Sequence, residues 1–156
     1  MHISQFLAPQ CILAGVAGGS KKRLLETISQ FAQEHNPDIE AEDIFDGLIE
    51  RERLGSTGVG DGVAIPHCRL EGCDKIIGIF FSLSEPIDFD SLDKQSVDLV
   101  FTLIVPSESN KEHLSALQGI ASLLGQADIR QQLRAATTAE QLYRILVGDE
   151  ADQAVP

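Results

Sequence analysis

The sequence predicts an α/β fold, in which a mixed parallel and antiparallel sheet is flanked by helices on both faces. Segments with strand character alternate along the chain with amphipathic helical segments, which is typical of this class. The run VDLVFTLIVP, residues 97–106, is almost continuously apolar, as expected of a central strand buried on both faces. The connection around residues 84–96 is too short for a helical crossover, so a fully parallel sheet is disfavoured.

The first part of the chain is expected to form one strand and two helices. The apolar run CILAGV, residues 11–16, precedes a pair of glycines and is predicted to be a strand. Ser20 is placed to cap a helix over residues 21–34, where apolar residues recur at helical spacing until Asn36-Pro37 ends it. A second helix is expected over residues 41–53, because apolar residues at helical spacing form a stripe that can be buried, namely Ile44, Phe45, Leu48 and Ile49. The basic residues of its last turn suit the helix dipole.

A glycine-rich loop separates these helices from the next strands. A short extended segment is expected at residues 63–67, and IIGIFFSL, residues 76–83, is predicted to be a strand. PIDFD, residues 86–90, is predicted to be a turn or edge structure.

Two capping boxes predict the last two helices. Ser109-x-x-Glu112 is expected to open a helix near residues 110–125. Thr137-x-x-Glu140 is expected to open another at residues 138–147, which ends at Gly148.

The length and composition predict one globular domain. A chain of 156 residues, 43% of them hydrophobic, can bury a core without disulfides or metals. We expect residues 1–148 to form this domain and residues 149–156 to be an acidic, disordered tail.

Charge and cysteine content narrow the functional classes. Twelve basic and twenty-four acidic residues give a formal charge of −12, which disfavours nucleic acid and anionic membrane surfaces. This charge suits a basic protein partner, but it is explained equally well by solubility alone. Three cysteines, an odd number, indicate a reducing compartment. No signal peptide or long apolar segment is recognisable, so the expected location is the cytoplasm, without membrane insertion.

The most informative segment is RERLGSTGVGDGVAIPHCRL, residues 51–70. Its glycines follow a helix and enter a strand, the reverse of the dinucleotide-binding context. The loop amides, with the hydroxyls of Ser56 and Thr57, are expected to form an anion-receptive concavity. Pro66 fixes the backbone directly before His67 and presents its imidazole to that concavity, an arrangement that suits phosphoryl transfer.

Two further side chains are candidates for the same site. His113 lies in the first turn of its expected helix, near amides that favour phosphate, and is placed to donate a hydrogen bond to a phosphoryl oxygen. Arg51 precedes the loop and is placed to fork onto phosphate oxygens, with Arg53 as its competitor. From the residues alone, other interpretations remain open. Each histidine could be a packing residue, and either arginine could be a surface cation.

These motifs resemble those of a known family. Residues 51–67, RERLGSTGVGDGVAIPH, resemble the active-site signature of the fructose/mannitol-type enzyme IIA domains of the phosphoenolpyruvate-dependent phosphotransferase system. IVPSESNKEHLSALQGIASLL resembles the segment that carries the family's second histidine. The likeness covers about residues 3–147, and within the family the chain is most similar to free-standing, nitrogen-regulatory members.

The resemblance implies roles for particular residues and partners. It assigns the phosphoryl group to His67, a phosphoryl hydrogen bond to His113 and a phosphate contact to Arg51. Ser56, Thr57, Gly58 and Pro66 fall within the signature as pocket residues.

The implied activity is a phosphotransferase half-reaction through a phosphohistidine. The donor would be a histidine phosphocarrier protein similar to HPr, and the phosphorylation state would signal to regulatory target proteins. No cofactor and no metal is implied.

Three alternatives remain open. The chain could be a sugar-pathway IIA that passes its phosphoryl group to a separate IIB protein. It could be a binding scaffold that is never phosphorylated. A metal-binding module of His67, Cys68, Cys73 and His113 is disfavoured, because adjacent residues of an extended segment point to opposite faces.

Overall fold

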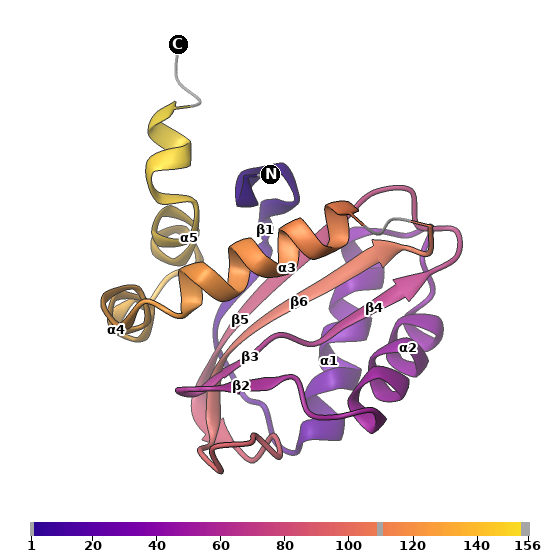
Figure 1. Ribbon diagram of the computed structural model, residues 1–156, viewed down its shortest axis with the longest axis horizontal. Helices are drawn as coiled ribbons and strands as arrows, with labels where there is room; N and C mark the ends of the chain where they lie inside the picture. Colours follow the sequence, from indigo (N-terminus) through magenta and orange to yellow (C-terminus); the bar gives the residue numbers. More distant parts are fainter. Residues whose placement is uncertain (1, 109–110, 154–156) are drawn as a thin grey trace.

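The computed structural model describes residues 2–108 and 111–153, which form one mixed sheet covered by helices (Figure 1). In chain order the elements are η1 (Ile3–Gln5), β1 (Leu7–Val16), α1 (Lys21–His35), α2 (Ala41–Arg53), β2 (Gly58–Gly60), β3 (Val63–Ala64), β4 (His67–Leu70), β5 (Ile77–Ile87), β6 (Val97–Pro106), α3 (Lys111–Leu124), α4 (Ala127–Ala135) and α5 (Ala139–Gln153).

The sheet is mixed, as predicted, and β6 lies at its centre. The strand order is β1-β5-β6-β3-β2, and β4 pairs with β6 beside this path. β5 and β6 are antiparallel, whereas β1 runs parallel to β5, and both β3 and β4 run parallel to β6. The antiparallel β5–β6 pair is the one that the short connection around residues 84–96 predicted.

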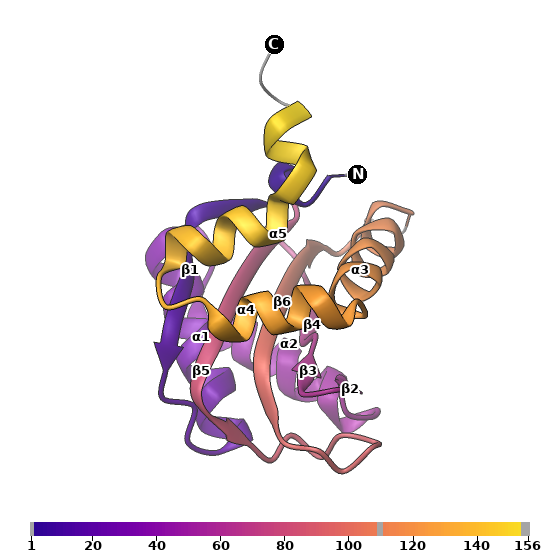
Figure 2. The same cartoon turned by 90° about the vertical axis from the view of Figure 1, so that its left-hand side faces the viewer.

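Helices cover both faces of this sheet (Figure 2). A hydrophobic core fills each interface between helices and sheet. α1 and α2 pack on one face against Phe81 and Val100, and α3, α4 and α5 pack on the other against Phe80 and Phe101. Successive residues of β5 and β6 therefore enter opposite cores, because side chains alternate along a strand. This double burial explains the nearly continuous apolar run of residues 97–106.

Several boundaries differ from the sequence prediction. β1 begins at Leu7 rather than residue 11, and β5 continues to Ile87, which brings the start of PIDFD into the strand. α4 was not predicted, because a nine-residue helix with one fully buried side chain, Leu133, gives a weak periodic signal.

The helix ends are confirmed in part. Ser20 caps α1 by accepting a hydrogen bond from the amide of Arg23 at 3.1 Å, as predicted. The second box is shifted by one residue: the Thr138 hydroxyl accepts from the amide of Gln141, whose side chain accepts from the amide of Thr138. The correct box is therefore Thr138-x-x-Gln141, not Thr137-x-x-Glu140.

The remaining predictions concern the start of α3 and the C-terminal end of the chain. Ser109 of the first capping box lies outside the described residues. The last helix bends at Gly148, where φ is +43°, and a helical segment continues to Gln153 rather than ending there. Of the predicted tail, residues 154–156 lie outside the described residues. No helix in the described part of the chain is both long and apolar enough to cross a membrane.

Candidate functional site

The predicted histidine is the first residue of β4, an edge strand that lies between α2 and α3 (Figure 1). β3 and β4 pair with successive stretches of β6, and Ile65-Pro66 interrupts them. Pro66 has no N–H to donate, but its carbonyl still accepts a hydrogen bond from the amide of Leu103 at 2.9 Å. β4 can therefore resume the pairing, and His67 is its first residue.

A cavity of about 670 Å³ opens beside this histidine. It is built from the last turns of α2, from β4 and from the first turn of α3, which are far apart in the sequence. Its lining residues are Gly47, Glu50, Arg51, Arg53, Leu54, His67, Cys68, Arg69 and His113.

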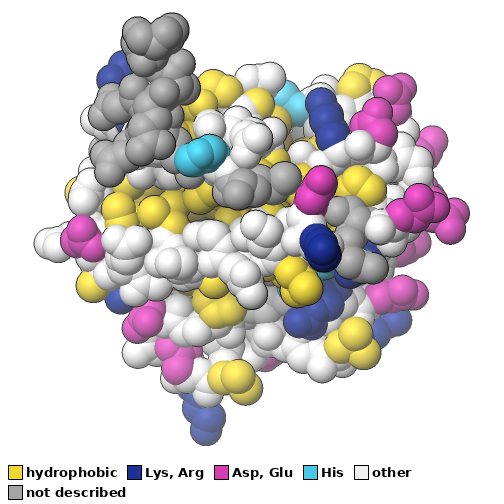
Figure 3. All heavy atoms as spheres, turned by 45° about the horizontal axis from the view of Figure 1, so that its top comes forward, with side chains coloured by type: hydrophobic (Ala, Val, Ile, Leu, Met, Phe, Trp, Pro, Cys, Tyr) yellow, Lys and Arg dark blue, Asp and Glu magenta, His cyan; other side chains and the backbone are white. Residues whose placement is uncertain are grey.

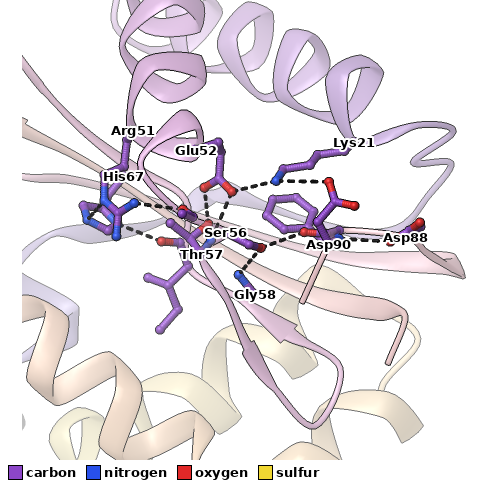
Figure 4. Close-up of polar contacts among 12 residues, drawn as sticks. Lys21, Arg51, Glu52, Ser56, Thr57, Gly58, His67, Asp88 and Asp90 are labelled. Carbon is purple, nitrogen blue, oxygen red and sulfur yellow. Dashed lines mark hydrogen bonds and ion pairs between the residues drawn. The ribbon is translucent and has the colours of Figure 1, made fainter. Parts of the chain in front are cut away.

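Two hydrogen bonds determine the tautomer of His67. Its Nδ1 lies 2.9 Å from the carbonyl oxygen of Ile65, and its Nε2 lies 3.3 Å from the Nε of Arg51. A carbonyl only accepts and a guanidinium only donates, so Nδ1 carries the proton and Nε2 presents its lone pair. The lone pair of Nε2 is directed toward Arg51 (Figure 4).

The surroundings keep this imidazole neutral. Burial lowers the pKa of His67 below its ordinary value, and the nearby charges of Arg51 and Arg69 lower it further. The hydrogen bond to the Ile65 carbonyl and the charge of Glu52 act in the opposite direction without reversing the shift. A neutral imidazole is the form that can attack an electrophile.

Arg51, rather than Arg53, is the arginine that reaches the histidine. Its NH1 group also donates to the carbonyl of Gly55 at 2.9 Å, which holds the guanidinium over the cavity. Arg53 is exposed at the end of α2 and lines the outer part of the cavity. The structure therefore distinguishes the two candidates that the sequence left open.

His113 faces His67 across the cavity. The ring centroids are 5.6 Å apart with an interplanar angle of 64°. His113 is 7% exposed, and neither of its ring nitrogens has a hydrogen-bond partner among the described residues. Burial lowers the pKa of His113, as do the charges of His67 and Arg69, so this ring too is neutral near pH 7. A buried polar ring without partners is costly unless a ligand satisfies it.

The hydroxyls of Ser56 and Thr57 do not face the cavity, which corrects the expectation that they help to form an anion-receptive concavity. Ser56 Oγ donates to the carbonyl of Phe89 at 2.7 Å, and the Thr57 hydroxyl donates to the carboxylate of Glu52 (Figure 4). Gly58 lies so close to Ser91 that an added Cβ would be 2.0 Å from its hydroxyl oxygen. These residues fix the path of the loop behind the site.

Sequence reasoning missed the partly buried ion pair that anchors this loop. The Glu52 carboxylate accepts from the Thr57 amide at 3.0 Å and lies 2.9 Å from Nζ of Lys21, at the start of α1. Nζ of Lys21 also lies 4.6 Å from the centroid of the Phe89 ring. Lys21 and Glu52 are distant in sequence, and such a pairing leaves no local pattern by which it could be predicted.

Comparison with known proteins establishes the family. Residues 5–148 match the family model described as "Phosphoenolpyruvate-dependent sugar phosphotransferase system, EIIA 2". The chain belongs to this family. The resemblance found in the sequence is therefore confirmed.

Relatives place this IIA protein among the nitrogen-regulatory members. It is 49% identical to a nitrogen regulatory protein of Pseudomonas aeruginosa, over 94% of this chain and 96% of that protein. It is 40% identical to the nitrogen regulatory protein of Escherichia coli K12, over 96% of this chain and 92% of that protein. The crystal structure of nitrogen regulatory protein IIA-Ntr from Neisseria meningitidis matches with a TM-score of 0.87 and 39% identity, over 92% and 98% of the two chains.

The depressed pKa of His67 makes a testable prediction for this IIA protein. We expect the imidazole resonances of His67 to titrate below the ordinary value of about 6.5. At a pH between the pKa of His67 in the folded protein and its higher pKa in the unfolded chain, the unfolded chain binds more protons. The free energy of unfolding therefore falls as pH drops below about 6.5, and this loss is complete below the folded pKa. NMR titration and urea unfolding from pH 7.5 to 4.5 measure the pKa and its effect on stability. A midpoint at or above 6.5 would contradict the lowered pKa of His67 and the neutral ring inferred from it.

The cysteine beside the histidine is not activated. Burial, with a smaller effect of Cys73, raises the pKa of Cys68 to about 12, so it is a thiol at neutral pH. Its Sγ packs 4.0 Å from the carbonyl oxygen of Ile44, on the α2 side of the strand. Among residues 2–108 and 111–153, no three His, Cys, Asp or Glu side chains are grouped to hold a metal ion.

Proposed function

We propose that this IIA protein accepts a phosphoryl group from a histidine phosphocarrier protein on Nε2 of His67. The observation that carries the proposal is the geometry at this nitrogen. A neutral ring, fixed in the Nδ1–H tautomer, directs its lone pair to a cavity that holds Arg51 and a buried, unpartnered His113.

The reaction is a direct transfer between two imidazoles. The lone pair of His67 Nε2 attacks the phosphorus of the carrier's phosphohistidine as the donor's P–N bond breaks, and that bond's electron pair returns to the donor nitrogen. Positive charge develops on the His67 ring, and the carbonyl of Ile65, which accepts from Nδ1–H, stabilises it. Arg51 and His113 supply donors for the equatorial phosphoryl oxygens.

Arg51 has to move for this reaction to occur. Its Nε–H donates to the lone pair of His67 Nε2, with the two nitrogens 3.3 Å apart. The phosphorus must approach the same lone pair. The guanidinium shifts from the nitrogen to the phosphoryl oxygens, where two of its N–H groups bind in a fork.

The output of the phosphorylation is a change of charge at the open edge of the sheet. A phosphoryl group adds nearly two negative charges at neutral pH, by analogy with other phosphorylated side chains. Target proteins that bind around His67 then distinguish the two states. This proposal places the protein in the cytoplasm, where phosphoenolpyruvate is made, and follows the family's nitrogen-regulatory members rather than its sugar transporters.

Incubation with enzyme I, a phosphocarrier and phosphoenolpyruvate tests the proposal. We expect the intact mass to rise by one phosphoryl group, with the label on the peptide that contains His67 under conditions that preserve acid-labile phosphohistidine. Absence of uptake from any phosphocarrier of the source organism would refute phosphoryl transfer and leave a binding scaffold.

A sugar-pathway role is the second candidate. The PTS system fructose-specific EIIA component of Haloferax volcanii is 34% identical over 101 residues, which are 65% of this chain and 66% of that protein. If this chain serves such a pathway, phosphorylated protein will pass its phosphoryl group to a purified IIB protein of the same organism. A regulatory IIA protein will instead keep the label in the presence of IIB.

A further inference from the structure

Glu52 differs from the acidic side chains at the surface of this protein. On the face that Figure 3 shows, acidic side chains lie mainly along one edge, where water surrounds them. The side chain of Glu52, in contrast, is 6% exposed. Burial of a carboxylate is costly unless hydrogen-bond donors and a positive charge surround it. The contacts of Glu52 are therefore specific ones, and they lead toward His67.

Lys21 and Thr57 hold this carboxylate. Nζ of Lys21 lies 2.9 Å from one of its oxygens. The amide of Thr57 donates to the carboxylate at 3.0 Å, and the Thr57 hydroxyl donates to its second oxygen. Thr57 is 3% exposed, so water does not compete for these bonds. The last turn of α2 thus holds Thr57 through both its backbone and its side chain.

Thr57 in turn fixes the residue that orients His67. The Thr57 carbonyl accepts a hydrogen bond from the Ile65 amide at 3.0 Å. The Ile65 carbonyl lies 2.9 Å from Nδ1 of His67. A continuous series of hydrogen bonds therefore runs from the Glu52 carboxylate, through the backbone of Thr57 and Ile65, to the ring nitrogen that carries the proton.

Two consecutive residues of α2 thus act on the two nitrogens of one ring. Arg51 contacts Nε2 directly, and Glu52 acts on Nδ1 through the loop. Figure 4 shows Arg51 and Glu52 at the same helix end, one directed toward His67 and the other toward Thr57. The negative charge of Glu52 also acts on His67 and favours the positive charge that develops on the ring during transfer.

We propose that Glu52 is a positioning residue for phosphoryl transfer, because it holds the Ile65 carbonyl at the place where this carbonyl fixes the Nδ1–H tautomer of His67. The inference rests on the proposed function and adds to it a residue that does not itself touch the phosphoryl group. Without Glu52 the loop loses its attachment to α2, and the proton moves to Nε2 in part of the molecules. A protonated Nε2 has no lone pair with which to attack phosphorus.

The test measures the tautomer and the transfer rate separately. Unphosphorylated protein labelled with ¹⁵N-histidine is studied by two-dimensional NMR of the imidazole at pH 7.5, where the ring is neutral. We expect only the Nδ1–H tautomer of His67 in the wild type and a measurable fraction of Nε2–H in Glu52→Ala. With the phosphorylated carrier, Glu52→Ala is expected to lower the maximal single-turnover rate about tenfold, while the half-saturating carrier concentration changes less than about threefold.

A milder pair of variants decides the question if Glu52→Ala does not fold. Thr57→Val removes the hydroxyl that donates to Glu52 but keeps the backbone and the volume of the side chain. It is expected to change the tautomer and the rate in the same direction as Glu52→Ala, by a smaller amount. Thr57→Ser keeps the hydroxyl and is expected to recover most of what Thr57→Val loses.

Thr138→Ala is the control for a general loss of stability. The Thr138 hydroxyl accepts from the amide of Gln141 at 3.1 Å at the start of α5, on the face of the sheet opposite α2. Loss of this cap lowers the free energy of unfolding. We expect the tautomer of His67 and the transfer rate to stay as in the wild type.

The outcomes separate this inference from the proposed function. If folded Glu52→Ala, or Thr57→Val in its place, keeps His67 entirely in the Nδ1–H tautomer, the positioning role is overturned while the proposed function stands. An equal change of tautomer in Thr138→Ala would overturn it as well, because the effect would then be one of stability alone. If the wild type takes no phosphoryl group from the carrier, the proposed function fails and the inference with it.

Discussion

Replacement of His67 by alanine is expected to reduce phosphoryl uptake from the carrier to an undetectable level. The neighbouring Cys68 is no substitute nucleophile, because its thiol has a pKa of about 12, and the proposed role of His113 is to donate to the phosphoryl oxygens rather than to accept the phosphorus. The fold should survive, since the His67 side chain is only partly buried and its hydrogen bonds are local. The measurement is the intact mass of the variant, taken at a reaction time at which the wild type is completely phosphorylated.

His35→Ala is the matched control for this variant. His35 lies at the end of α1, where its Nδ1 contacts the carbonyl of Phe31 at 3.1 Å, and it takes no part in the site. We expect it to be phosphorylated as fast as the wild type. Full labelling of the His67→Ala protein, with the phosphoryl group on His113 or elsewhere, would show that the acceptor has been misassigned.

Replacement of Arg51 by alanine is expected to slow phosphoryl transfer about 10²- to 10³-fold. Removal of one preorganised donor to a developing charge commonly costs about 3–4 kcal/mol of transition-state stabilisation. Arg51→Lys should recover part of the rate, because it restores the charge but not the planar fork. Single-turnover kinetics with the phosphorylated carrier measure these rates.

The same variant has a readout that is independent of catalysis. Because the charge of Arg51 lowers the pKa of His67, Arg51→Ala should raise the midpoint of its NMR titration toward the ordinary value. Arg144→Ala, an exposed arginine on α5, is the control for loss of a positive charge. Transfer by Arg51→Ala within about threefold of wild type would remove this arginine from the mechanism.

The architecture could be predicted from the sequence because its strongest signals come from burial. The run at residues 97–106 matches β6 at both ends, and α2 has its expected bounds, since apolar periodicity and caps act locally. β4 resumes the pairing with β6 only after the interruption at Ile65-Pro66. It was harder to predict, because a strand of four residues shows no periodicity of its own. α4 was missed for the same reason.

The candidate site was predictable as a set of residues but not as an arrangement. Pro66-His67 after a glycine-rich loop, with a second histidine at a helix start, indicated which side chains to expect together. The choice of Arg51 over Arg53 depends on the direction of a helix end relative to β4, and no spacing rule gives that. The anchoring of the loop by Lys21 and Glu52 is likewise a tertiary pairing.

The measurement that tests the central claim most directly is the identification of the phosphorylated nitrogen. Protein labelled with ¹⁵N-histidine is phosphorylated by the carrier, and two-dimensional NMR of the imidazole distinguishes the two isomers. Because Nδ1–H donates to the Ile65 carbonyl and Nε2 faces the cavity, we predict the phosphoryl group on Nε2 of His67. A phosphoryl group on Nδ1, or on His113, would contradict the tautomer and the mechanism built on it.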